Sequence, residues 1–134
     1  MTSNKKILIE EWIKRANDDE RNVVATLKYK EGTPAQVCFL AQQIAEKYFK
    51  ALLLFYTDDY PKTHDLNQLA TLLKPFNKSI FDFFGKEINS LSSYYIGTRY
   101  PADIPLESFT WDEAQNAFES AKKIKDFVIG QISL

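Results

Sequence analysis

The chain has 134 residues, of which 45% are hydrophobic and 26% charged, and its formal net charge is -1. This length and composition predict one globular domain over residues 1–134, and the balanced charge excludes a bulk attraction to nucleic acid or to an anionic membrane. A single cysteine and a single histidine exclude an intramolecular disulfide and a His/Cys zinc site, so we expect no metal and no cofactor.

The first two predicted helices cover about residues 7–29 and residues 34–57. In the first, apolar residues recur at three-, four- and seven-residue spacings, and Asp19 falls on the same stripe. Residues 32–34 then read Gly-Thr-Pro, the order of a helix stop, an N-cap and a first helical turn. The second helix is apolar on most of its circumference, so we expect it to be the central helix of a bundle, or to meet another chain as well.

A short third helix and a longer fourth helix are predicted next. Thr63 is the expected N-cap of the third helix, which ends before Pro75. The fourth helix covers about residues 79–96, and Gly85 marks a point where it could kink.

Residues 97–110 contain two prolines and form the one long loop that the sequence predicts. The last helix follows it, with Thr110 or Asp112 as its cap. Five helices with mostly short connections predict an all-α, up-and-down bundle of four long helices plus one short helix.

The sequence also indicates the cellular compartment of the protein. Residues 1–6 are polar and predict no signal peptide, and the longest apolar stretch is interrupted by charged residues, which excludes a membrane span. Cys38 lies among apolar neighbours, so we expect a buried, inert thiol in a reducing compartment. These features together predict a cytoplasmic protein.

A narrow polar stripe runs along the central helix. Gln43, Glu46, Lys47 and Lys50 are spaced i, i+3, i+4 and i+7, and Glu46 precedes Lys50 in the favourable order for an ion pair. The stripe is either the solvated strip of an amphipathic helix or a polar seam lining a groove between helices or subunits.

Two further features are candidates for a site. The residues next to His64 are of the types expected at the start of a helix, but this does not account for His64 itself. His64 is either a structural residue that is hydrogen-bonded across the bundle or part of a site. Arg99 comes where a helix gives way to the long loop, and a guanidinium group suits phosphate. The flanking tyrosines, which include Tyr95 and Tyr100, could stack on a base.

Taken together, these motifs resemble the HEPN family, the higher eukaryotes and prokaryotes nucleotide-binding domain. The resemblance covers nearly the whole chain in the expected order. The matching residues are Trp12, Ala16, Asp19, the stretches 38–47 and 50–53, Pro61, Thr63-His64-Asp65-Leu66, Tyr95 and Arg99-Tyr100-Pro101.

The resemblance implies a bundle of four or five helices that often forms a homodimer. Many members are encoded beside a minimal nucleotidyltransferase and act as toxin or antitoxin partners, and others are metal-independent ribonucleases or nucleotide binders. The ribonuclease members carry a histidine shortly after the arginine. Here the corresponding positions hold Ile104, Pro105 and Leu106, and no histidine follows His64.

The leading prediction is therefore a non-catalytic HEPN protein. It would bind a nucleotide, an RNA phosphate or a partner nucleotidyltransferase through a groove near Arg99, Lys47, Lys50 and His64. One alternative is a metal-independent ribonuclease, for which His64 would have to replace the missing proton carrier. Another is a purely structural dimerisation module, which the phenylalanines at 81, 83 and 84 and the apolar central helix would favour.

Overall fold

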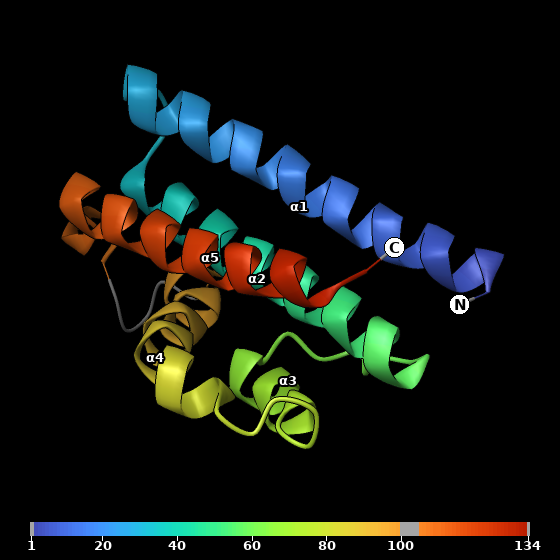
Figure 1. The fold of residues 1–134 in the computed structure, drawn as a ribbon. Coiled ribbons are helices and arrows are strands. Elements are labelled where there is room, and N and C mark those ends of the chain that lie inside the picture. Colours follow the sequence, from blue (N-terminus) through green and yellow to red (C-terminus); the bar gives the residue numbers. More distant parts are fainter. Residues whose placement is uncertain (1, 100–104, 134) are drawn as a thin grey trace.

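Five α-helices and one short 3-10 turn make up the fold (Figure 1). The structure, a computed structural model, describes residues 2–99 and 105–133, with the backbone alone described at 96–99. No strand occurs among these residues, and the all-α bundle of four long helices plus one short helix is confirmed. The elements are α1 (Ser3–Tyr29), α2 (Pro34–Thr57), α3 (Leu66–Leu73), α4 (Ile80–Arg99), the turn η1 (Leu106–Ser108) and α5 (Trp111–Gln131).

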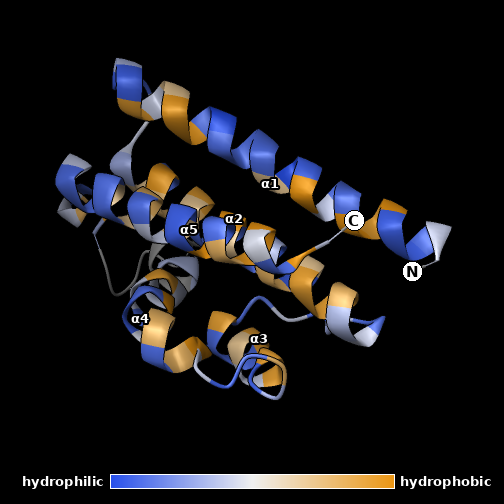
Figure 2. Cartoon of the chain, viewed as in Figure 1, coloured by the Kyte–Doolittle hydropathy of each residue, from blue (hydrophilic) through white to orange (hydrophobic). Residues whose placement is uncertain are grey.

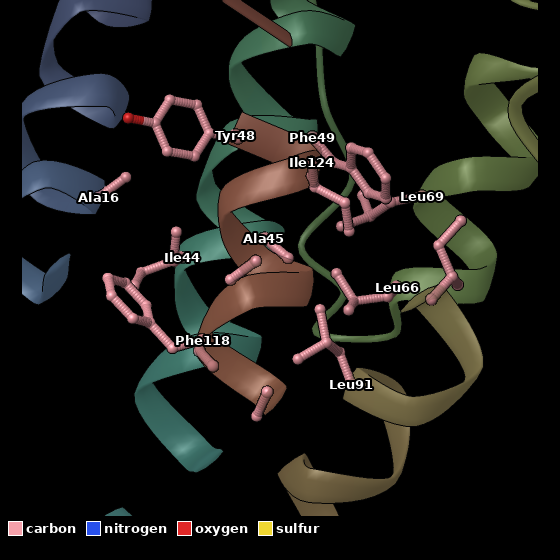
Figure 3. Packing of buried hydrophobic residues seen from close by; sticks show 14 of the residues in the cluster. Ala16, Ile44, Ala45, Tyr48, Phe49, Leu66, Leu69, Leu91, Phe118 and Ile124 are labelled. Atoms are coloured by element: carbon pink, nitrogen blue, oxygen red, sulfur yellow. The ribbon is translucent and has the colours of Figure 1, made fainter. Parts of the chain in front are cut away.

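Helix α2 lies at the centre of the bundle and packs against α1, α3, α4 and α5. Most of its length is orange in the hydropathy view, while α1 and α5 carry blue outer faces (Figure 2). Its side chains Ala45 and Phe49 meet Leu69 of α3, Leu91 of α4 and Ile124 of α5 in one core (Figure 3). The predicted role of this helix as the central element of the bundle is confirmed.

Hydrogen bonds at the helix starts confirm two predicted caps and correct a third. The Thr33 hydroxyl accepts from the Gln36 backbone N–H at 3.2 Å, and Thr110, not Asp112, caps α5. Helix α3 is capped by Asp65, although Thr63 was predicted. The Thr63 hydroxyl instead accepts from the backbone N–H of Asp65 at 3.1 Å, which is a local turn before the helix.

The remaining boundaries differ modestly from expectation. Helix α1 begins at Ser3, earlier than the predicted start near residue 7, because Thr2 caps it. Helix α4 continues past residue 96 to Arg99, and Gly85 lies inside the continuous helix. None of the described helices is long and apolar enough to span a bilayer.

The Cys38 thiol is fully buried, as predicted. Burial raises the pKa of this thiol to about 12, and the nearby Glu113 carboxylate adds to the shift. The nucleophilic thiolate is therefore disfavoured, and Cys38 behaves as a small core residue.

Candidate functional site

The polar stripe of α2 is a buried seam. Glu46 and Lys50 are only 3% and 4% exposed, and Gln42, one position before the predicted stripe, is completely buried. Gln43 and Lys47 are half-buried at the edges of the seam. The interpretation of the stripe as a solvated strip is therefore wrong, and the alternative of a polar seam between elements fits the structure.

The Glu46 carboxylate is the hub of this seam. The Lys50 ammonium donates to Oε2 at 3.0 Å, which confirms the predicted ion pair, and the Gln42 amide donates to Oε1 at 3.3 Å. The His64 ring adds a third partner from the turn before α3. A buried carboxylate is costly unless it is paired and hydrogen-bonded, and these three partners meet that need.

Lys50 is enclosed on its other side by two aromatic rings. Its Nζ atom lies 5.3 Å from the centroid of the Trp12 ring and 6.0 Å from that of Tyr60. Both distances are within the range of cation–π attraction. Because Glu46 and the two rings surround the ammonium group, Lys50 holds Glu46 in place and offers almost no surface to a ligand.

The other two predicted residues of the stripe point to different partners. Lys47 forms an ion pair with Asp19 of α1, the acidic residue on the apolar stripe of the first helix. The Gln43 amide donates to the Gln42 side-chain oxygen at 2.9 Å, so it supports the seam from one side.

His64 has a fixed orientation. Its Nδ1 atom lies 3.1 and 3.0 Å from the two carboxylate oxygens of Glu46, and its backbone carbonyl accepts from the Gln42 amide at 3.0 Å. Because a carboxylate only accepts hydrogen bonds, we assign the proton to Nδ1, and in the neutral ring Nε2 is then an acceptor. None of the hydrogen bonds among the described residues uses Nε2. The side chain is 53% exposed, and Nε2 lies on the ring edge away from the Nδ1 atom that faces Glu46.

An open pocket of about 540 Å³ borders the exposed part of His64. The ring of His64 stacks on that of Tyr95, with centroids 5.1 Å apart and planes inclined by 14°. Tyr95 and Arg99 are four residues apart in α4, so their positions share one face of the helix. The pocket is lined by Lys62, Thr63, His64, Asp65, Ser92 and Tyr95.

The structure thus brings some of the predicted site residues together and separates others. Glu46, Lys50, His64 and Tyr95 form one connected cluster, which Gln43 supports, while Lys47 belongs to the contact with α1. The Arg99 side chain and Tyr100 lie outside the described residues. Sequence reasoning missed the contributions of Gln42, Trp12, Tyr60, Lys62 and Ser92.

Comparison with known proteins places this arrangement in a family. The HEPN domain family matches residues 9–132. TT1696 from Thermus thermophilus is similar in structure, with a TM-score of 0.82 and 30% identity, over 92% of this chain and 98% of that one.

A second solved structure, ST0689, described as an archaeal HEPN homologue, has a TM-score of 0.72 and 29% identity, over 93% of this chain and 98% of that one. No curated protein matches this chain. The family match, together with the five-helix bundle, shows that the chain belongs to the HEPN family.

Proposed function

We propose that this HEPN protein binds a nucleotide or an RNA phosphate at the pocket beside His64, without cleaving it. The observation that carries the proposal is the orientation of His64, whose Nδ1 is held by the buried Glu46 carboxylate while the half-exposed side chain lines the pocket. A polar atom held in this way at an open pocket is a ready hydrogen-bonding partner for a ligand.

A cation on the rim of the pocket suits an anionic ligand. Lys62 is exposed on the rim, and Arg99 follows Tyr95 by one helical turn. An arginine can donate two parallel hydrogen bonds to a phosphate, whereas a lysine acts as a point charge. Because Lys47 and Lys50 are held in ion pairs with Asp19 and Glu46, we assign phosphate contact to Lys62 and Arg99.

A thermal-shift titration with ATP, GTP and short RNA tests the proposal. A ligand at about 100 times its Kd stabilises the native state by about 2.7 kcal/mol, which gives a clear shift. We expect Arg99→Ala and Lys62→Ala to reduce the shift. Lys78→Ala, another exposed lysine that lies outside the pocket lining, is the matched control. No shift with any of these ligands would overturn the proposal.

We also propose that this surface contacts a protein partner, a minimal nucleotidyltransferase of a toxin–antitoxin-like pair. The support is membership of the HEPN family, since the resemblance to that family implies such pairs. A nucleotidyltransferase encoded next to this protein is the partner to test by co-purification. If the Arg99→Ala variant captures as much nucleotidyltransferase as the wild-type protein, the pocket has no role in the pairing.

The orientation of His64 also favours a second candidate function, a metal-independent ribonuclease. A carboxylate that holds one ring nitrogen while the other faces a pocket is the arrangement of a histidine that transfers protons. His64 Nε2 would take the proton of a ribose 2′-hydroxyl, whose oxygen bonds to phosphorus. The bond from phosphorus to the 5′-oxygen would break, and that oxygen would take a proton from water.

This candidate predicts RNA cleavage in the presence of EDTA. The cleavage should be lost in both His64→Ala and Arg99→Ala, and kept in Lys78→Ala. Intact RNA after incubation at high protein concentration would reject the ribonuclease and leave the binding function.

A further inference from the structure

Three aromatic rings from separate elements lie in contact beside the pocket. The rings of Phe39 from α2 and Tyr95 from α4 have centroids 6.5 Å apart and planes inclined by 30°. The next ring is His64, from the turn before α3, at 5.1 Å and 14° from Tyr95. The tyrosines were predicted to stack on a base, but His64 already covers one face of Tyr95. His64 is the more exposed of the two rings, since it is exposed and Tyr95 is half-buried.

The exposed part of His64 can be identified from its contacts. The Nδ1 edge faces Glu46, and one face of the ring lies against Tyr95. With 53% of the side chain still exposed, we assign the exposed surface to the opposite face and the Nε2 edge. His64 lines the open pocket of about 540 Å³.

We propose that the face of His64 opposite Tyr95 stacks on the base of a bound nucleotide, so that the imidazole ring lies between Tyr95 and the base. The proposal rests on the proposed function and deepens it, because it names the base, in addition to the phosphate, as a recognised group. Flat rings prefer offset stacking at centroid separations such as the one already present between His64 and Tyr95, and histidine is among the side chains on which unpaired bases stack.

The ring is held in place before a ligand arrives. Glu46 binds its edge, Tyr95 covers its inner face, and the Gln42 amide holds the backbone carbonyl of His64. A side chain fixed in this way loses little conformational freedom on binding, so more of the stacking energy contributes to affinity. Glu46 is then a positioning residue for the stacking ring.

Stacking strength sets the expected ligand preference. A single base stacked on an aromatic side chain changes affinity by about 10- to 100-fold. We therefore expect AMP and GMP to bind about 10- to 100-fold more tightly than ribose 5-phosphate, which lacks a base. CMP, with its smaller ring, should lie between the purine nucleotides and ribose 5-phosphate.

Isothermal titration of the full chain with AMP, GMP, CMP, ribose 5-phosphate and inorganic phosphate tests this inference. Two variants separate the ring from its hydrogen bond. His64→Phe keeps a flat ring and should keep the preference for AMP over ribose 5-phosphate. His64→Asn keeps a polar donor without a ring, and should remove the preference. Thermal unfolding of both variants checks that they are folded.

The outcomes distinguish this inference from the function on which it rests. Equal affinity of the wild-type protein for AMP and ribose 5-phosphate would overturn base stacking and leave phosphate binding intact. A preference for AMP that survives in His64→Asn would place the stacking elsewhere and also overturn the inference. Absence of binding by all five ligands would overturn both proposals.

Discussion

His64 Nδ1 lies within 3.1 Å of both carboxylate oxygens of Glu46, a buried residue 18 positions earlier in the chain. One carboxylate therefore neutralises the buried Lys50 ammonium and also orients the histidine of the candidate site. The stability of the bundle and the geometry of the pocket depend on the same group.

Removing this carboxylate should destabilise the fold strongly. In Glu46→Ala the Lys50 ammonium would stay buried without a counter-charge, and we expect the free energy of unfolding to fall by about 3–5 kcal/mol. Urea unfolding measures the loss. Glu10→Ala is the matched control, because the Lys6–Glu10 pair has the same i,i+4 spacing but about half of each side chain is exposed. Its removal should cost less than about 1 kcal/mol.

A double variant tests whether the unpaired Lys50 charge causes this loss of stability. Glu46→Leu with Lys50→Met removes both buried charges, so it should be more stable than Glu46→Ala alone. A loss below about 1 kcal/mol in Glu46→Ala would show that the Lys50 charge finds another partner.

Alkaline pH should destabilise the protein. Burial raises the pKa of the Cys38 thiol and of the Tyr48 phenol to about 12, from ordinary values of 9.0 and 10.0, and it also raises the pKa of Tyr94. The unfolded chain therefore releases these protons at pH values where the folded chain still holds them. The free energy of unfolding then falls as pH rises from about 9 to about 12, and is unaffected by these groups at lower pH.

Tyr48→Phe separates the contribution of one phenol. The Tyr48 hydroxyl donates to the Asn17 side chain at 2.9 Å, so the variant should lose about 1 kcal/mol near neutral pH. Urea unfolding from pH 7 to 11 should show a shallower decline in the variant than in the wild type. Parallel declines would mean that Tyr48 does not contribute to the alkaline loss.

The hydroxyl of Thr33 should stabilise the start of the central helix. Thr33→Ala should lower the free energy of unfolding by about 1 kcal/mol, because the Gln36 N–H loses its acceptor. Thr2→Ala is the matched control, since the Thr2 hydroxyl accepts from Lys5 N–H at the same 3.2 Å but lies at the exposed start of α1, near the end of the chain. If Thr33→Ala and Thr2→Ala lower the free energy of unfolding equally, the packing around α2 does not increase the stabilisation that the Thr33 hydroxyl provides.

Phe83 should take part in homodimer formation if the chain assembles as the sequence predicts. It is 74% exposed on α4, and it is one of the phenylalanines at 81, 83 and 84 that favour a dimerisation module in the sequence. Analytical ultracentrifugation at micromolar concentration should show a dimer for the wild type and a monomer for Phe83→Ser. Ile7→Ser, at a residue 61% exposed on α1, is the control and should leave the dimer intact. A monomeric wild type would contradict the expectation.

Local signals in the sequence were sufficient to predict the fold. The central helix was placed at its observed bounds because Thr33 and Pro34 mark its start and its apolar circumference continues to the end. The start of α3 was misplaced because Thr63 and Asp65 are both common caps. Only the backbone conformation decides between them, and Asp65 is the residue whose side chain accepts from Asn67 N–H.

The site could be predicted only in part. The i,i+4 order of Glu46 and Lys50 is visible in the sequence, and so is the unusual place of Asp19 on an apolar stripe. Gln42 lies four positions before Glu46, so the same spacing could have revealed it. The rings of Trp12 and Tyr60 around Lys50 could not be found, because no periodicity links residues that meet only through tertiary packing.

The shared carboxylate of Glu46 limits how such a protein can diversify. A substitution of Glu46 that leaves the Lys50 charge unpaired disturbs the bundle, so a change of ligand made at Glu46 alone carries a large loss of stability. The rim residue Lys62 is exposed, and it can be exchanged with little effect on the core. New specificities in relatives with this architecture should therefore arise by changes at the rim around an unchanged Glu46.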